Sequence, residues 1–563
     1  MVGINKILRL AYQTAVAYTR GSVAAPFDIL VIGSGATGCC VALDAATRGL
    51  RVGLVERDNY SAGTSSRSTK LVHEACVRYL EKAFWQFDYG QLKLVFHALE
   101  ERAHILQNAP QLCNALPTMT PCYEWWEVLY YRAGLKLYDL MNDSQLNVAI
   151  ACTAALVGAV VLNHAEAISL KKDEVTGNVT GAHIHNKLTG NEFDVHAKVV
   201  INATGPFCDE VQKMADKSAS QMISPSGRVH IVLPDYYSPD HMGLVVPKTK
   251  DGRVVFMLPW LGRTVAGATD SATTLTMHLE AHEEEIEFIL DAISDYLVVK
   301  GTDTALISRD HVVCLDLDGL VTVTGGKWTT YKSMAEDAVN VAIKSGSLQP
   351  TNGVSFLKSS YFWLWALPLI GVNGWNPSSF TSLAQNYVCM KRAYSGKIVP
   401  GPMDTAAAKH LVQTYGGLAP HVALIAQACL SQTWLASWTE TNTSSGCLPC
   451  RCIASEALVL LHMGGLGKRL AHGYPYLEAE VAYCARTEYC ESAVDFIARR
   501  ARLAFLETDV ANRASSRVIE ILTAEHRWDK AQKKAAMVDV KAFLETFKSS
   551  KNAQFADGKH RAR

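Results

Sequence analysis

The chain has 563 residues, enough for about three or four domains of ordinary size. Hydrophobic residues make up 49% and charged residues 19% of it, which excludes a disordered protein and allows sizeable cores. The 54 basic and 54 acidic side chains cancel. This balance excludes a general electrostatic attraction to nucleic acid and leaves room for a local site for an anionic substrate.

The 15 cysteines are scattered, and several fall within expected strands and helices. That distribution indicates buried thiols in a reducing compartment and not a disulfide framework. Cys447, Cys450 and Cys452 form the one sequence cluster, but no fourth ligand follows at the spacing of a zinc site. We therefore expect no metal centre.

The amino-terminal segment Met1–Pro26 carries Lys6, Arg9 and Arg20 and no acidic residue, with apolar side chains at helical spacing. This composition is typical of a mitochondrial presequence; the alternative is an ordinary basic terminus. No run in the chain reaches the roughly 18 to 20 uncharged apolar residues of a membrane span. Any membrane contact is therefore expected to be peripheral.

A buried parallel strand is predicted at Phe27–Ile32, which is short, apolar and rich in β-branched residues. Gly33, Gly35 and Gly38 follow it in the spacing G-x-G-x-x-G. The first glycine permits a tight turn, the second lets the backbone approach a pyrophosphate, and the third lets a helix pack close to the strand.

The predicted helix Cys39–Arg48 presents its amino-terminal amides to the phosphates, and a second strand, Arg51–Val55, ends in Glu56. A carboxylate there can accept both hydroxyls of an adenosine ribose and disfavours a 2′-phosphate, so the unit predicts FAD or NAD and not NADP. The alternative is a glycine-rich structural turn in another βαβ unit.

Further along the chain, small hydroxylated residues from Ser61 to His73 suit a loop that lines a cofactor. The elements expected next are helices at Val77–Ala103, Trp125–Met141 and Val148–Leu156, a short strand after Gly158, and a strand at Val199–Gly205.

Turn residues separate four short apolar runs that predict an antiparallel sheet: His230–Leu233, Gly243–Val246, Val254–Leu258 and Thr264–Ala268. An amphipathic helix, Glu283–Tyr296, follows, and then a strand, Leu320–Thr324, that leads through Gly-Gly-Lys to a helix near Thr330.

The region after about residue 375 is mainly helical, with helices expected over Lys409–Ala428, Leu477–Leu506 and Val518–Phe547. Arg499, Arg500 and Arg502 are interpreted as a solvated or partner-facing surface. Ser431–Cys452 reads as a loop or insert.

Longer motifs give the sequence a resemblance to the FAD-dependent glycerol-3-phosphate dehydrogenases of the mitochondrial or respiratory type. They are, in order, GTSSRSTKLVH with VRYLEKA, NAP, GLKLYDLM, INATGPFCD, HIVLPDYYSP, VFMLPWLGRTVAGATDS, ISRDHVV, VTVTGGKWTTY and EAEVAYCARTEYCESAVDFIARRARLAF. The resemblance runs from about residue 25 to 547.

This resemblance implies an α/β fold with an FAD-binding Rossmann-like domain of the glutathione-reductase and D-amino-acid-oxidase type. An antiparallel-sheet substrate domain is inserted in it, and a helical domain closes the chain. The implied organisation is a targeting segment at 1–26, a discontinuous FAD-binding domain at 27–375 with a substrate sheet at about 206–300, a helical domain at 376–547 and a disordered tail at 548–563.

The resemblance also implies the residues of the site. Those that would hold FAD are Gly33, Ser34, Gly35, Gly38, Glu56, Arg57, Ser65, Thr69, Lys70, Thr204, Gly205, Pro206, Gly325, Gly326 and Lys327. Those that would bind the substrate phosphate are Arg78, Tyr79, Arg309 and Lys327. The catalytic set would be His230, Arg309 and Lys327, with His230 assisting removal of the proton from the C2 hydroxyl.

These residue types suit the chemistry, because guanidinium and ammonium groups bind a dianionic phosphate strongly and an imidazole can accept a hydroxyl proton. The implied reaction is oxidation of sn-glycerol 3-phosphate to dihydroxyacetone phosphate, with electrons passed to a quinone. The implied protein is peripheral on the mitochondrial inner membrane, binds no nucleic acid and is a candidate homodimer.

Three features depart from the family pattern. His73-Glu74-Ala75-Cys76-Val77 replaces a Gly-Gly segment, Gln145 stands where an arginine is usual, and a G-[VI]-R-P-L segment is absent near Val298–Thr302. They leave open a flavin-binding paralogue that has lost catalysis and serves as a partner or assembly subunit. An FAD oxidase acting on an amine or a hydroxy acid is a further alternative, which the phosphate-directed cations disfavour.

Overall fold

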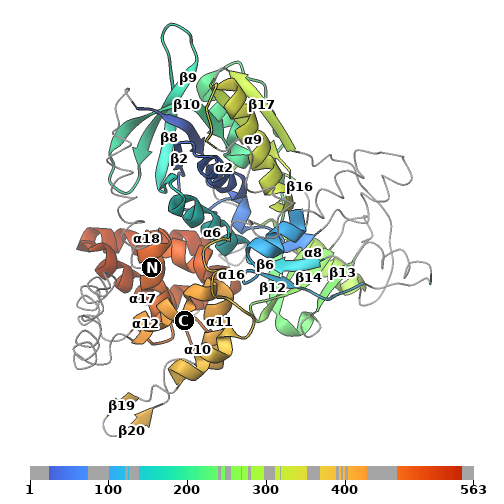
Figure 1. Ribbon diagram of the computed structural model, residues 1–563. Helices are drawn as coiled ribbons and strands as arrows, with labels where there is room; N and C mark the ends of the chain where they lie inside the picture. The colour runs from blue at the N-terminus through green and yellow to red at the C-terminus, as the bar shows by residue number, and fades with distance from the viewer. Residues whose placement is uncertain are drawn as a thin grey trace, which may run out of the picture.

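The computed structural model describes residues 25–73, 101–120, 125, 138–238, 242–246, 255–267, 269, 271–276, 281–296, 311–317, 319–326, 328–351, 368–388, 392–394, 397–399, 404–427 and 466–547. Three parts are visible in Figure 1: a mixed α/β part at the top, a five-stranded sheet at the lower right and a bundle of helices at the lower left.

The α/β part is built on an eight-stranded sheet. Its main path runs, in spatial order, through β17 (His311–Leu317), β18 (Leu320–Gly325), β10 (Glu192–Asn202), β1 (Phe27–Ile32), β2 (Val52–Val55) and β7 (Val160–Leu162). All neighbours on this path are parallel except β17 and β18. The carboxyl ends of β18, β10, β1 and β2 therefore meet at one edge, where ligands bind in folds of this kind.

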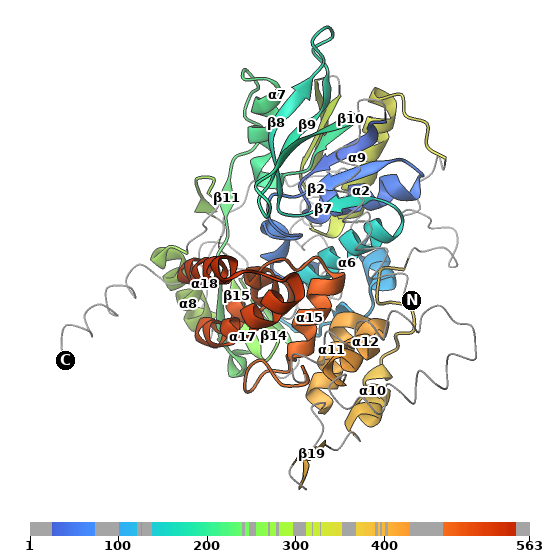
Figure 2. The ribbon, with the colours of Figure 1, turned by 90° about the vertical axis from the view of Figure 1, so that its left-hand side faces the viewer.

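Both faces of this sheet are buried, as the continuous apolar sequence of β1 requires. Ile29 and Val31 face helices α2 (Ala36–Thr47), α6 (Asp143–Leu156) and α9 (Tyr331–Ser345). Leu30 and Ile32 face the opposite layer, which contains β8 (Ala165–Lys172), β9 (Val179–Asn186) and α7 (Cys208–Ala215). Figure 2 shows these two layers from the side.

Strands β8 and β9 are the remaining two strands of the eight-stranded sheet, and they branch off through β10. Residues 192–196 of β10 pair with β9, and residues 197–202 pair with β1 and β18. The sequence indicates only the second half of this strand, Val199 onward. It also does not indicate the hairpin β8–β9, whose exposed positions do not alternate regularly along β8.

The five-stranded sheet has the order β12 (His230–Pro234), β15 (Arg263–Gly267), β14 (Val255–Trp260), β13 (Gly243–Val246) and β5 (Thr118–Met119). The four strands predicted from the sequence are confirmed. The fifth, β5, joins from far upstream of residues 206–300.

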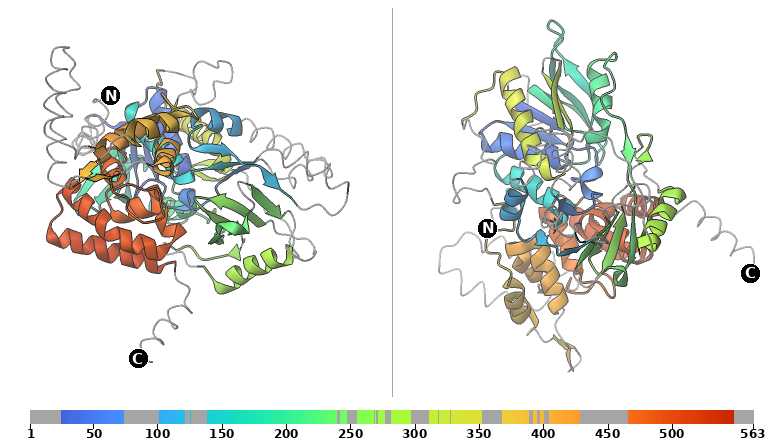
Figure 3. Two further views of the ribbon diagram at one scale, coloured as in Figure 1. Left: turned by 90° about the horizontal axis from the view of Figure 1, so that it is seen from below. Right: turned by 90° about the vertical axis from the view of Figure 1, so that its right-hand side faces the viewer.

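One face of this sheet packs on α8 (Glu283–Tyr296), through Ile289 and Ile293. The other face packs, through Trp260 and Val265, on the helices that follow residue 378. Figure 3 shows α8 lying along the sheet on the side away from the helical bundle. Two small sheets, β3 (Leu71–His73) with β6 (Tyr138–Met141) and β4 (Cys113–Ala115), and β11 (Ser226–Gly227) with β16 (Ser271–Ala272), complete this region.

The helices, which we call the helical unit, are α10 (Ser379–Val388), α11 (Thr405–Tyr415), α12 (Ala419–Gln427), α15 (Glu478–Thr487), a π-helix (Asp495–Arg500), α16 (Leu503–Leu506), α17 (Thr508–His526) and α18 (Lys530–Glu545). A short ribbon, β19 (Arg392–Tyr394) and β20 (Lys397–Val399), follows α10. No described helix is both long and apolar enough to cross a membrane.

Two predicted helices are wrong in extent. The segment Val518–Phe547 is two helices, because Arg527 takes a left-handed conformation (φ 57°) and Asp529 with Gln532 forms a capping box that starts a new helix. The segment Leu477–Leu506 is likewise interrupted, by residues such as Tyr489 and Arg502 with positive φ. Tyr138–Met141, predicted as helix, is strand β6.

The β10 core gives a test of the sheet's contribution to stability. Ile201 is 0% exposed at the centre of the sheet, whereas Ile168 in β8 is 40% exposed. We expect Ile201→Ala to lower the free energy of unfolding by about 2–5 kcal/mol and Ile168→Ala to change it by less than about 0.5 kcal/mol, measured by chemical denaturation. Equal losses in the two variants would contradict this packing.

Candidate functional site

The turn between β1 and α2 accepts only glycine at two positions. Gly33 has φ 99°, and a Cβ atom there would lie 2.7 Å from the Ala203 carbonyl oxygen. A Cβ atom at Gly38 would lie 1.9 Å from the Gly33 carbonyl oxygen. The glycines therefore let the helix and the β10 end approach each other, and they place no side chain of their own over the amino-terminal amides of α2.

The Glu56 carboxylate is fixed beside this turn. Its Oε2 accepts hydrogen bonds from the Ser34 amide at 2.7 Å and the Ser34 hydroxyl at 3.0 Å. Its Oε1 accepts one from the Asp58 amide at 3.0 Å. A carboxylate has about four acceptor positions, so capacity remains for a ligand hydroxyl. Asn147 of α6 supports the turn from behind, donating to the Ser34 carbonyl at 2.8 Å.

Segments from the neighbouring strand ends reach the same edge. Thr204, Gly205 and Pro206 follow β10, and Gly205 has φ 60° with open space where a Cβ atom would lie. The Arg57 guanidinium stands over the Phe207 ring, 4.8 Å from its centroid. The residue after Glu56 in the chain is thereby in contact with an aromatic ring from the segment after β10.

Gly325 and Gly326 end β18, and both have positive φ. The next described residue, Trp328, donates from its indole nitrogen to the Ser65 carbonyl at 3.0 Å. Ser65 belongs to residues 61–70, which we call the cofactor loop, and its hydroxyl accepts from the Ala36 amide of α2 at 2.9 Å. The chain after β18, the cofactor loop and the first turn of α2 are therefore in contact through Ser65.

The five-stranded sheet reaches the cofactor loop through His230. The His230 Nε2 lies 3.4 Å from the Thr69 hydroxyl. Gly267 is paired with His230 across the strands, and a Cβ atom at Gly267 would lie 2.9 Å from the His230 ring. Glycine at this position (φ 152°) lets the imidazole lie flat against β15, facing the loop.

His230 is a weaker base than the near-neutral imidazole suggested by its type. The His230 side chain is partly exposed to solvent, but protein atoms surround most of it. Burial lowers the pKa of His230 to about 3, assisted by the positive charges of Lys70 and Arg228 and opposed by Asp143. The ring is therefore neutral at physiological pH and has a lone pair available as a proton acceptor.

Arg500 and Arg502 are not a solvated surface, because their exposures are 3% and 2%. Arg500 donates to the Asn59 side chain at 2.6 Å and to the Glu488 carbonyl. Asn59 and Asn163 in turn donate to the Tyr489 carbonyl at 2.8 and 2.9 Å. The helical unit is thereby docked on the chain that follows Glu56, a role that sequence reasoning missed.

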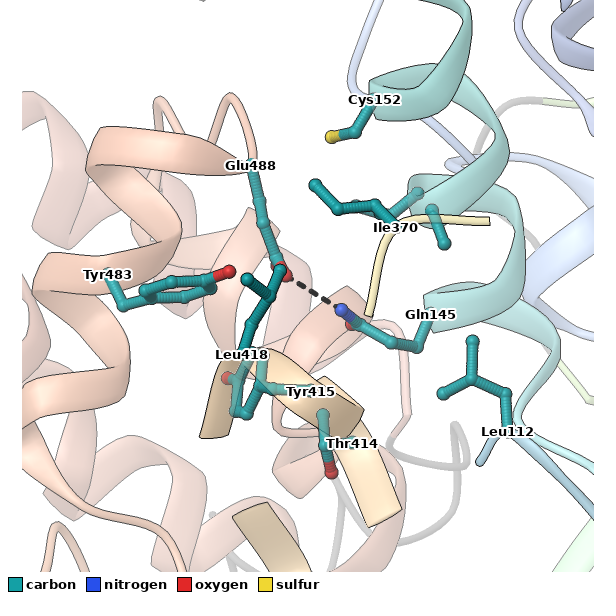
Figure 4. Close-up of a pocket in the computed structure, with 11 residues that line it drawn as sticks. Leu112, Gln145, Cys152, Ile370, Thr414, Tyr415, Leu418, Tyr483 and Glu488 are labelled. Carbon is teal, nitrogen blue, oxygen red and sulfur yellow. Dashed lines mark hydrogen bonds between the residues drawn. The ribbon is translucent and has the colours of Figure 1, made fainter. Parts of the chain in front are cut away.

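A small pocket, partly open to solvent, lies between α6 and the helical unit. Figure 4 shows Gln145 and Glu488 pointing toward one another across it, and the Gln145 amide donates to Glu488 at 2.8 Å. Burial raises the pKa of Glu488, and Arg500 offsets this only in part. No predicted cofactor or substrate residue of the described chain lines this pocket. Its walls come mainly from α6 and the helical unit, where these two parts of the chain pack on each other.

Arg78, Tyr79, Arg309 and Lys327 lie outside the described residues, as do the departures at 74–77 and 298–302 and the cluster Cys447, Cys450 and Cys452. The described part of the predicted site is the set of cofactor residues with His230. The geometry brings these together, and it adds Asp143, Asn147, Trp260 and Arg502. Trp260 and Arg502 lie inside the quoted family motifs and Asp143 and Asn147 lie outside them, but no pattern in the sequence assigns any of the four to the site.

The residues at this edge fit an adenine dinucleotide. Two glycines whose Cβ atoms would meet backbone keep side chains of their own away from the helix amino terminus, which suits a pyrophosphate, and the fixed Glu56 carboxylate suits a ribose with free hydroxyls.

This cradle is testable with a matched pair of glycine variants. We expect Gly38→Ala to lose bound flavin, because its Cβ atom would displace the Gly33 carbonyl. Gly473→Ala places a similar atom in open space at φ 81° and should cost only about 1 kcal/mol of strain with full flavin content. Flavin content is read from the visible absorbance of the purified protein. Full occupancy in Gly38→Ala would contradict the assignment.

Comparison with known proteins agrees with this geometry. Residues 28–124 and 121–320 match the family model of FAD dependent oxidoreductases, and residues 366–533 match that of the C-terminal domain of alpha-glycerophosphate oxidase. The mitochondrial glycerol-3-phosphate dehydrogenase SDP6 of Arabidopsis thaliana is 56% identical over 95% of this chain and 88% of its own. The mitochondrial glycerol-3-phosphate dehydrogenase of Homo sapiens is 40% identical over 92% of this chain and 73% of its own.

Among solved structures, the glycerol-3-phosphate dehydrogenase from Bacillus halodurans complexed with FAD has the same fold. It superposes with a TM-score of 0.67 at 21% identity, over 95% of this chain and 98% of that one. The identity with the two mitochondrial enzymes, over nearly the whole chain, goes beyond fold. The chain belongs to the family of FAD-dependent glycerol-3-phosphate dehydrogenases.

Proposed function

We propose that this protein oxidises sn-glycerol 3-phosphate to dihydroxyacetone phosphate with bound FAD. The observation that carries the proposal is the meeting of the dinucleotide cradle with a neutral histidine of the five-stranded sheet, at the contact between Thr69 and His230. The names of the relatives supply the substrate.

In this proposal Glu56 binds the ribose hydroxyls, the first turn of α2 binds the pyrophosphate, and the cofactor loop with Thr204–Pro206 and Gly325–Lys327 lines the rest of the cofactor. FAD, when bound, supplies the hydride acceptor. The protein's task is to align carbon 2 of the substrate and to take up the hydroxyl proton.

His230 is the described side chain placed for that second task, although its low pKa makes it a weak base. Its imidazole is neutral, with Nε2 beside the Thr69 hydroxyl and Cδ2 close to Gly267. As carbon 2 loses its hydride, the proton of its hydroxyl becomes more acidic, and a neutral imidazole within hydrogen-bond distance can accept that proton. Arg78, Tyr79, Arg309 and Lys327 are proposed to hold the substrate's dianionic phosphate, which selects phosphorylated alcohols.

The electron acceptor is proposed to be a quinone, reached by peripheral attachment to the mitochondrial inner membrane. The relatives' names support the mitochondrial location, and the basic segment Met1–Pro26 supports import. A homodimer is proposed as the assembly.

A spectrum of the purified protein tests the reaction directly. We expect sn-glycerol 3-phosphate to bleach the visible flavin bands anaerobically, and glycerol, glycine and lactate to leave them unchanged. Bleaching by an unphosphorylated substrate would favour an oxidase of another class. A stable oxidised flavin in the presence of glycerol 3-phosphate would favour a paralogue without catalysis.

The role of His230 predicts a selective loss of rate. We expect His230→Asn to slow flavin reduction by glycerol 3-phosphate about 10²–10⁴-fold, because general-base assistance contributes that much, with flavin content unchanged. His183→Asn, which removes a half-exposed histidine of β9 paired with Asp194, should keep the wild-type rate in the same stopped-flow assay. A wild-type rate in His230→Asn would remove its role as base.

A further inference from the structure

Three separate parts of the chain meet at a buried charge cluster beside the cofactor loop. Lys70 ends the loop, Asp143 opens α6, and Arg502 precedes α16 in the helical unit. Their side chains are 7%, 1% and 2% exposed. Charges this deeply buried require partners, and the partners in this cluster are mainly one another.

Asp143 is the anion of the cluster. Its Oδ2 accepts from the Lys70 ammonium at 3.1 Å and from the Ser68 hydroxyl at 2.9 Å. Its Oδ1 accepts from the Ser144 amide at 2.8 Å and lies 3.8 Å from the Arg502 guanidinium. Burial opposes ionisation of Asp143, but Lys70 and Arg502 outweigh it and lower the pKa of the carboxyl. The cluster therefore has two cations and one anion.

Lys70 is held in one position by backbone as well as by charge. Its ammonium donates to the Ser68 carbonyl at 2.9 Å and the Ser66 carbonyl at 3.4 Å, and its backbone is left-handed with φ 66°. Arg502 donates to the same Ser66 carbonyl. The cofactor loop is thereby wrapped around two cations, one from its own end and one from the helical unit.

The five-stranded sheet closes the cluster through Trp260. The Lys70 ammonium lies 5.2 Å and the Arg502 guanidinium 5.6 Å from the Trp260 ring centroid. Both distances are within the range of cation–π attraction. All three parts of the molecule thus meet at Lys70. Lys70 directly follows Thr69, whose hydroxyl contacts His230.

We propose that Lys70 is a positioning residue for His230: anchored by Asp143 and Arg502, it holds Thr69 against the imidazole and keeps an excess positive charge beside it, so that the ring stays neutral. The role of the neutral ring rests on the proposed function, whereas the effect of Lys70 on its protonation does not. The motif GTSSRSTKLVH contains Lys70, but the sequence predicts for it only a role in lining the cofactor.

The described charged groups that act on His230 come from three elements: Lys70 of the cofactor loop, Asp143 of α6 and Arg228 before β12. Lys70 and Arg228 disfavour the imidazolium, and Asp143 favours it. Removing the Lys70 charge should therefore raise the pKa of His230, and removing the Asp143 charge should lower it.

The test follows protonation of His230 without turnover. Neutral imidazoles react with diethyl pyrocarbonate, and imidazolium ions do not. The holoenzyme is treated with this reagent from acid to neutral pH, and mass spectrometry measures modification of the peptide that carries His230. The pH dependence of this modification reports the pKa of His230. We expect Lys70→Met to move the acid limb of this reaction upward by about one pH unit or more. Lys70→Arg should restore the wild-type limb, because it keeps the charge.

Lys198→Met is the matched control, because Lys198 is 51% exposed and pairs with Asp28 far from the cluster; its limb should coincide with wild type. If Lys70→Met does not retain flavin, Asp143→Asn serves instead, with the limb expected to move downward. A limb that is unchanged in a flavin-replete Lys70→Met protein, or that rises in Asp143→Asn, overturns the proposal.

The rate of flavin reduction separates this inference from the proposed function. If His230→Asn is slow and the His230 limb of Lys70→Met is unchanged, the base assignment stands and the inference fails. If His230→Asn keeps the wild-type rate while the limb moves as expected, the electrostatic effect stands and the proposed role of His230 fails.

Discussion

The structure depends on neutralising one buried carboxylate, that of Asp143. A buried ion that loses a partner costs about 3–5 kcal/mol, because the remaining charge cannot be solvated. Asp143 lies in the first turn of α6, where the helix amides favour a negative charge. It still requires Lys70 and Arg502. The cofactor loop, α6 and the helical unit are therefore held in one relative position by a requirement that none of them meets alone.

The same requirement sets the electrostatics of the candidate site. With two cations around one anion, the cluster remains positive, and burial limits the screening of that charge by solvent. A positive surrounding favours a dianionic phosphate and disfavours a protonated His230. Consistent with this, burial and Arg502 lower the pKa of Lys70 to about 8, and Asp143 opposes them. An interaction that stabilises the fold thus also selects the protonation state that the proposed chemistry needs.

The sequence was sufficient where the determining contacts are local. The βαβ unit, the four strands around His230 and the helix Glu283–Tyr296 follow from periodicity and turn residues within a few positions of one another. It was insufficient where contacts are distant. Arg500 and Arg502 are spaced like surface charges, yet their partners Asn59 and Ser66 lie 441 and 436 residues away. The β8–β9 hairpin was missed because β8 does not alternate regularly between buried and exposed positions, and the cofactor residues were identified because a motif carries them.

The position of the helical unit follows from these long-range contacts. It covers the chain immediately after Glu56, where Asn59 and Asn163 both donate to the Tyr489 carbonyl and Tyr60 packs edge-on against Tyr489 at 5.5 Å. A loop that must close around a cofactor pays a large conformational entropy when it is free. By fixing the loop at Asn59 and again at Ser66, the helical unit removes that entropy before any ligand arrives. The cradle is therefore preorganised by a part of the chain that supplies none of its motif residues.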